Sequence, residues 1–88
     1  MTIQQAMTAA MKHFNKERPE ATILRVSLSE ASGKFDARVI ISALIHIEYI
    51  IDNDFNESNN HPTYVRVEDV NGEATAQYIF SRSLNCDL

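Results

Sequence analysis

The first part of the chain carries apolar residues at the spacing of an α-helix. They recur at intervals of three or four residues and form one stripe: Ile3, Met7, Ala10, Met11 and Phe14. Thr2 with Gln5 three positions later is typical of a capping box, which satisfies backbone donors at a helix start. Pro19 cannot continue a helix, and it disfavours helical geometry at the residue before it. The pattern therefore predicts a helix over about residues 3–17.

After the helix, the period of the apolar residues changes to two, which is typical of a half-buried strand. Residues 30–33, with the sequence Glu-Ala-Ser-Gly, have the composition of a turn, and the alternation resumes at Phe35. A loop over 30–33 would pair Leu28 with Phe35 and Leu24 with Val39, so that the apolar side chains share one face. This agreement predicts a hairpin.

Residues 39–51 fit both a strand and a helix. Six Ile and one Val in this stretch favour a strand, because β-branched side chains lose rotamer freedom in a helix. A helix would also place Arg38 at its positive end and Asp52 and Asp54 at its negative end, against its dipole. A strand continuing from Phe35 would be about 18 residues long, which exceeds the usual length. A bend or bulge near residues 42–44 would resolve this.

The clearest signal lies in the last third of the chain. Residues 52–62 have a loop composition, and two strand patterns, 63–70 and 73–81, then flank Asn71-Gly72. Asn-Gly is the preferred pair for a two-residue type I′ hairpin turn. The expected register places three pairs on one face: Val67 with Ala76, Val65 with Tyr78, and Thr63 with Phe80.

These elements predict one α+β domain over residues 1–88. The expected fold is an N-terminal helix packed on a four-stranded antiparallel sheet, in the order α-β-β-β-β, with a long bent second strand. The alternative is α-β-β-α-β-β, in which residues 36–54 form a second helix. The expected fold resembles the cystatin-like architecture in its general shape, and a likeness of shape implies no function.

Composition is that of an ordinary globular chain. The 88 residues suffice for one core. No stretch has the pattern of a signal peptide or the length of a membrane span, and we expect a cytoplasmic protein. The single cysteine, Cys86, excludes an internal disulfide and a multi-thiolate zinc site, and it fits a reducing compartment.

The motifs that carry chemistry are incomplete. Residues 52–58 alternate oxygen-bearing side chains like a calcium loop, but Glu57 stands where the EF-hand loop needs Gly. His46 and Glu48 match half of a zinc-deaminase motif whose cysteine half is missing. Both glycines, Gly33 and Gly72, fall in predicted turns, which leaves none for a phosphate-binding loop. We therefore expect no enzymatic activity and no metal or other cofactor.

Charge is unevenly distributed, although the net charge is only −4. Residues 39–88 carry two basic groups against eight acids, and four of these acids gather in segment 48–57: Glu48, Asp52, Asp54 and Glu57. Such a segment can attract a basic partner. On the strand interpretation, four apolar side chains would also point away from the helix: Ile40, Leu44, Ile50 and Ile79. Because exposed apolar patches mark interfaces, we expect a homodimeric interaction or regulatory module.

Two alternatives remain open. The predicted strands place three arginines on the outer face of the sheet, near Tyr64 as a stacking platform: Arg25, Arg38 and Arg66. This is a candidate surface for an anion or a nucleic-acid strand, although the net charge of −4 opposes non-specific binding to phosphates. The other alternative is a small-ligand pocket between helix and sheet, lined by four aromatic residues: Phe14, Tyr49, Tyr78 and Phe80.

Overall fold

A computed structural model describes residues 1–33, 39–51 and 63–81 of the chain, with the backbone alone at residues 78, 80 and 81. The described part holds one helix and four strands. They are α1 (Ile3–Glu17), β1 (Ala21–Gly33), β2 (Ile40–Ile51), β3 (Thr63–Val70) and β4 (Glu73–Ser81). The strands form one antiparallel sheet in the order β1-β2-β3-β4. The predicted α-β-β-β-β fold is confirmed, and the alternative with a second helix is wrong.

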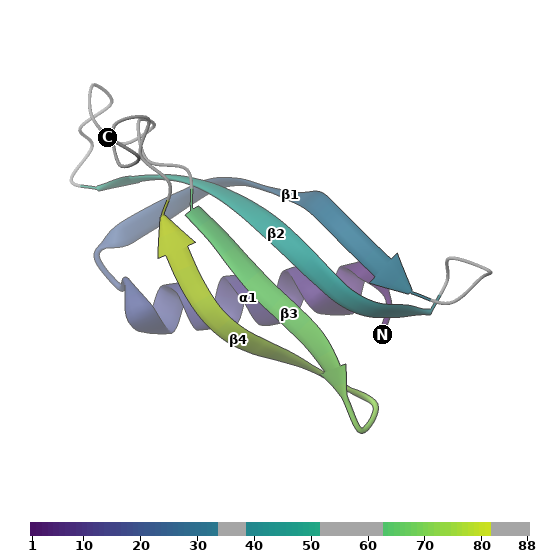
Figure 1. Ribbon diagram of the computed structural model, residues 1–88. Coiled ribbons are helices and arrows are strands. Elements are labelled where there is room, and N and C mark those ends of the chain that lie inside the picture. The colour runs from purple at the N-terminus through teal and green to yellow at the C-terminus, as the bar shows by residue number, and fades with distance from the viewer. Residues whose placement is uncertain (34–38, 52–62, 82–88) are drawn as a thin grey trace, which may run out of the picture.

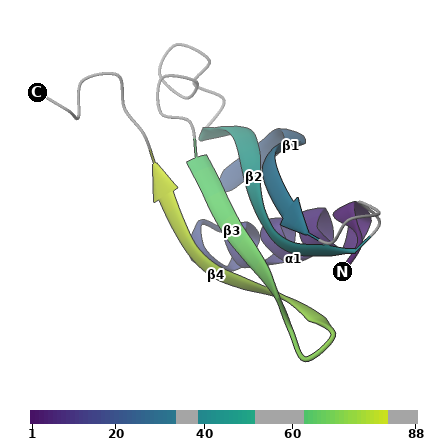
Figure 2. The same cartoon turned by 45° about the vertical axis from the view of Figure 1, so that its right-hand side comes forward.

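The molecule has two layers, the sheet and the helix. In Figure 1, α1 runs behind the four strands, and Figure 2 shows the strands curving over it. Of the two faces of the sheet, α1 covers one, which we call the inner face, and the opposite face is called the outer face. The edges of the sheet are β1 and β4.

Helix α1 begins and ends where the sequence predicts. The Thr2 hydroxyl accepts a hydrogen bond from the Gln5 amide at 3.1 Å, and the Thr2 amide donates to the Gln5 side chain at 2.8 Å, which completes the capping box. At the other end, the Arg18 amide donates to the Phe14 carbonyl at 2.8 Å. Pro19 follows and stops the helix.

The core lies between α1 and the inner face of the sheet. Three helix residues spaced four apart are fully buried in it: Ala6, Ala10 and Phe14. They meet alternate residues of the two central strands: Ala43, Ile45, Ile47, Tyr49, Val65 and Val67. The rings of Phe14 and Tyr49 pack with centroids 5.1 Å apart. Two members of the predicted stripe, Ile3 and Met11, are instead 41% and 38% exposed, so the core stripe is rotated relative to the prediction.

The first hairpin is longer than predicted. Residues 30–33 are not a turn: they belong to β1 and pair with β2, as Ala31 does with Ala43. Val26 lies opposite Ile47 and Leu28 opposite Ile45, rather than opposite residues 35–39. This register sets the whole apolar stretch 40–51 against β1, which buries more apolar surface than a short hairpin ending at residue 30 would.

Bulges account for the bend of this hairpin. Leu24 and Ser29 on β1 and Ile41 on β2 are extra residues between neighbouring pairs of the ladder. The extra residue at Ile41 reverses the inside-outside alternation, so Ile40 is in the core although strand parity placed it outside. Strand β2 starts at Ile40 and has 12 residues, which removes the difficulty of an overlong strand.

The second hairpin has the predicted turn and part of the predicted register. Asn71 and Gly72 both have positive φ, 55° and 89°, as a type I′ turn requires. Val67 lies opposite Ala76 as expected, but Gln77 is an extra residue on β4. Beyond this bulge Val65 therefore lies opposite Ile79 rather than Tyr78.

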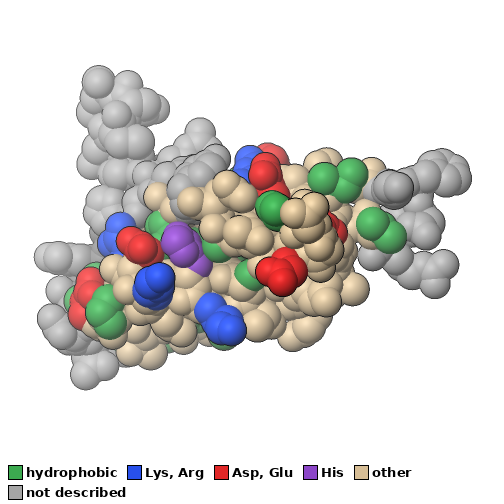
Figure 3. Space-filling model, turned by 90° about the horizontal axis from the view of Figure 1, so that it is seen from below, with side chains coloured by type: hydrophobic (Ala, Val, Ile, Leu, Met, Phe, Trp, Pro, Cys, Tyr) green, Lys and Arg blue, Asp and Glu red, His purple; other side chains and the backbone are tan. Residues whose placement is uncertain are grey.

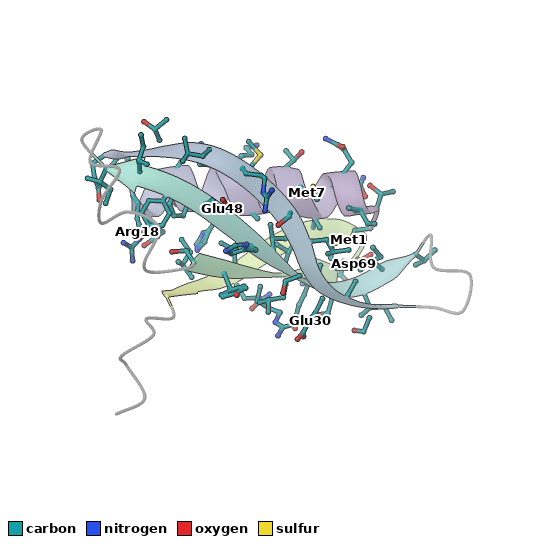
Figure 4. All side chains as sticks on the ribbon, turned by 90° about the horizontal axis from the view of Figure 1, so that it is seen from above. Met1, Met7, Arg18, Glu30, Glu48 and Asp69 are labelled. Atoms are coloured by element: carbon teal, nitrogen blue, oxygen red, sulfur yellow. The ribbon has the colours of Figure 1, made fainter. Side chains whose placement is uncertain are left out.

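The N-terminal amino group, directly before α1, forms hydrogen bonds with β2 and β3. It donates to the Asp69 carboxylate at 2.7 Å and to the Ile40 carbonyl at 3.1 Å, and the Ile40 amide donates to the Met1 carbonyl at 2.9 Å. Figure 4 shows Met1 and Asp69 side by side. This ion pair and the amide of Gly72, which also donates to Asp69, lower the pKa of the Asp69 carboxyl.

Candidate interaction surface

The outer face of the sheet is not the apolar patch that the sequence predicts. Ile40 is in the core and Ile79 packs against it, since the bulges at Ile41 and Gln77 change their side of the sheet. Leu44 and Ile50 do lie on the outer face by strand parity, but they are only 9% and 5% exposed. An exposed apolar interface on this face was therefore a wrong expectation.

Two of the predicted arginines are on the outer face, but they do not form a cluster. Arg25 pairs with Glu48 at 2.8 Å, and Arg66 donates to the Ser42 hydroxyl at 3.2 Å. Their partners in the ladder, Glu48 and Leu44, are four residues apart on the intervening strand. Strand spacing then separates the two arginine Cα atoms by about 16 Å. Arg38 lies outside the described residues.

Tyr64 already has a stacking partner within the chain. Its ring lies 5.1 Å from the His46 ring, with 28° between the planes, on the neighbouring strand. The register also sets the backbone of Tyr78 opposite Arg66 and that of Phe80 opposite Tyr64. Of the four residues of the predicted small-ligand pocket, Phe14 and Tyr49 are in the core. The side chains of Tyr78 and Phe80 lie outside the described part of the chain, so this pocket stays a prediction.

One of the four acids of segment 48–57 falls within the described residues. Glu48 is on β2, its carboxylate pairs with Arg25, and its side chain is 34% exposed. Asp52, Asp54 and Glu57 lie outside the described residues, so the acidic segment stays a prediction.

A different surface is apolar and exposed, and it lies where α1 meets β1. Two sets of side chains form it, and together we call them the α1–β1 seam. They are Ile3, Met7 and Met11 from α1, and Ile23, Val26 and Leu28 from β1. The helix residues are spaced four apart and share one flank of α1, next to the core stripe. Figure 4, which looks down on the β1 side of the molecule, labels Met7 on this helix.

Burial along the seam is incomplete. Met7, Ile23, Val26 and Leu28 are half-buried and pack against the core, whereas Ile3 and Met11 are exposed. The bulge residue Leu24 beside them is 50% exposed. The described residues therefore leave an apolar strip along an edge of the sheet.

A groove lies at the end of the seam near the start of α1. It has a volume of about 290 Å³ and is lined mainly by apolar residues: Ile3, Leu28, Ala31, Ser32, Gly33, Val39 and Ile40. Because Ile3 shares this groove with Leu28 and Ala31, the flank of α1 that carries Ile3 faces β1. Val39 adds a side chain that is 41% exposed.

The opposite flank of α1 has a polar character. There, a groove of about 460 Å³ separates α1 from the start of β4, and its lining includes Gln4, Thr8, Lys12 and Glu73. The view from below in Figure 3 shows charged and apolar side chains interspersed, with no gathering of apolar ones into a single patch. The two flanks of the helix therefore differ, and the apolar one faces β1.

The sequence contains the signal for the seam within the single predicted stripe. Ile3, Met7 and Met11 share this stripe with Ala10 and Phe14, because a period of three or four residues does not separate neighbouring flanks of a helix. Ala6 is not a member of the predicted stripe, yet it is fully buried. Spacing of four residues divides the apolar positions of the helix into two rows, Ala6-Ala10-Phe14 and Ile3-Met7-Met11. One sheet can cover only one of these rows, so the second row indicates a further apolar flank.

Within the part of the chain that the structure describes, no three His, Cys, Asp or Glu side chains come together as metal ligands. No described helix is long and apolar enough to cross a membrane. Comparison with known proteins gives no match to a family model, a curated protein or a solved structure.

Proposed function

We propose that the chain is a small protein-interaction module that associates with a second copy of itself through the α1–β1 seam. The observation that carries this proposal is the apolar stripe Ile3-Met7-Met11 on α1, in which Ile3 and Met11 are exposed and Met7 is half-buried. When a partner removes apolar side chains grouped in this way from water, the complex is stabilised by about 25 cal/mol for each Å² of apolar surface buried.

A second copy fits this surface for a chemical reason. The seam is apolar, so it favours an apolar partner surface. A second copy of the chain carries the same apolar seam and is present wherever the protein is. A two-fold axis brings the same patch of both copies together, which is the commonest geometry of homo-oligomers. Methionine suits such an interface because its unbranched side chain adapts to an irregular partner surface.

Sedimentation equilibrium over a range of concentrations tests the proposal. The wild type should form dimers, and Met11→Lys should shift the equilibrium to monomer, because dimerisation would bury the new ammonium in an apolar contact. Thr8→Lys is the matched control: it adds the same charge to the same helix at an exposed position that lines the polar groove. A wild type that stays monomeric, or a Thr8→Lys variant that dissociates as readily as Met11→Lys, would contradict the proposal.

The acidic segment 48–57 supplies a second part of the proposal, binding of a basic protein partner. Its support is the run of residues from 39 to 65 that contains no Lys or Arg but four acids. The test is binding of a lysine-rich peptide by fluorescence anisotropy at low and high salt. The combined variant Glu48→Gln, Asp52→Asn, Asp54→Asn, Glu57→Gln should lose this binding, and so should the wild type at high salt. Equal binding by both proteins would contradict this part.

A further inference from the structure

The edge strand β1 is complementary to itself. Its middle alternates between outer-face residues, Arg25 and Ser27, and inner-face residues, Val26 and Leu28. When two copies of this stretch run antiparallel with Ser27 opposite Ser27, Val26 of each copy lies opposite Leu28 of the other. The inner-face residues then meet inner-face residues, which is the condition for two edges to join into one sheet.

The charges agree with the same register. Going outward from Ser27, the next outer-face residue is Arg25 in one direction and Glu30 in the other, because Ser29 is an extra residue in the bulge. Arg25 of one copy therefore lies opposite Glu30 of the second copy, and the two-fold axis repeats the pair. The side chain of Arg25 is 70% exposed despite its pairing with Glu48, and a guanidinium has five N–H donors. It can therefore bind both carboxylates.

We infer that two copies join β1 to β1 in antiparallel orientation, centred on Ser27, so that their two sheets become one continuous sheet. This inference rests on the proposed self-association and specifies its geometry. Both α1 helices then lie on the same face of the joined sheet, and the Ile3-Met7-Met11 stripes approach each other across the axis. The surface that each copy leaves exposed is thus covered by the same surface of the other.

The bulges in β1 limit how far the edges pair. Bulges commonly protect edge strands from uncontrolled pairing, because they interrupt the row of backbone donors and acceptors. Here they stand at Leu24 and Ser29 and leave the regular stretch 25–28 between them. The joined region is therefore short and has one register, which is typical of a closed dimer rather than an open stack of sheets.

Cysteine cross-linking tests the register. Ser27→Cys and Ser32→Cys are made separately in a Cys86→Ser background, which removes the chain's one cysteine. Directly opposite residues on antiparallel strands have Cα atoms about 4.5–5.5 Å apart, within the range for a disulfide. The two copies of Ser32 would instead be ten residues apart along the joined strands, roughly 30 Å. On mild oxidation, Ser27→Cys should give a disulfide-linked dimer, and Ser32→Cys should give no disulfide-linked dimer.

A charge exchange provides an independent measurement by sedimentation. Glu30→Arg places arginine opposite arginine twice in each dimer and should raise the dimer dissociation constant roughly tenfold. Adding Arg25→Glu to the same chain restores opposite charges and should recover most of the affinity. Circular dichroism checks that each variant is folded.

The outcomes separate the two proposals. Cross-linking at Ser27 but not at Ser32, with rescue by the charge exchange, supports the β1-centred dimer. A dimer in which Ser32 cross-links as well as Ser27, or in which charge exchange gives no rescue, overturns this geometry and leaves self-association standing. A wild type that sediments as a monomer at every concentration overturns both.

Discussion

Substitution of Phe14 tests the position of the core most severely. Its side chain is fully buried, and its ring packs against Tyr49 with centroids 5.1 Å apart. Phe14→Ala removes the ring from a site that the sheet and the rest of α1 hold in place, so a cavity remains. Such substitutions cost about 3–5 kcal/mol of the free energy of unfolding. In a domain of this size, about 4–8 °C of melting temperature is lost for each kcal/mol, which gives a decrease of roughly 12–40 °C.

The matched control is Met11→Ala, on the same helix and in the same predicted stripe. Because Met11 is 38% exposed, this change should alter the free energy of unfolding by less than about 1 kcal/mol. Urea unfolding followed by circular dichroism measures both values, at a protein concentration low enough to keep the chain monomeric. If Met11→Ala costs as much as Phe14→Ala, the rotation of the core stripe described above is wrong.

Three further predictions follow from particular contacts. Asp69 has a lowered pKa in the folded protein, so it stabilises the fold above its unfolded value of 3.8, and this contribution disappears as the pH falls through the lower folded value. The wild type should accordingly be more stable than Asp69→Asn at pH 7 in thermal melts, and the difference should vanish in acid; a difference that grows in acid would contradict this. A Cβ on Gly33 would overlap the carbonyl oxygen of Val39, so Gly33→Ala should lower the free energy of unfolding by about 1–3 kcal/mol in urea titrations, and an unchanged value would refute the close approach. Arg25→Ala breaks an exposed ion pair and should cost at most about 1 kcal/mol in the same assay; a loss of several kcal/mol would show that the pair is not a surface contact.

Local signals in the sequence predicted the element types well. The Thr2–Gln5 capping box and Pro19 fix the ends of α1 through backbone hydrogen bonds between close neighbours, and such signals do not depend on the rest of the fold. The Asn71-Gly72 turn is similar, because its positive φ values are a property of two residues.

The registers could be predicted only in part, since bulges are invisible to a strict period of two. One extra residue at Ile41 moved Ile40 into the core, and one at Gln77 changed the partner of Val65. Each bulge is selected by the fit of the whole sheet over α1, which is a tertiary effect. Because these bulges turn Ile40 and Ile79 toward the core, the outer face lacks the predicted apolar patch, and the candidate interaction surface is the α1–β1 seam.

The most direct test of the central claim is a dilution series of two-dimensional NMR spectra with assigned amide and methyl signals. Dilution from a dimeric to a monomeric sample should shift the signals of Ile3, Met7, Met11 and Leu28, while those of Thr8 and Arg66 stay in place. Concentration-dependent shifts centred on Arg66 and the outer face, with none along the α1–β1 seam, would contradict the account.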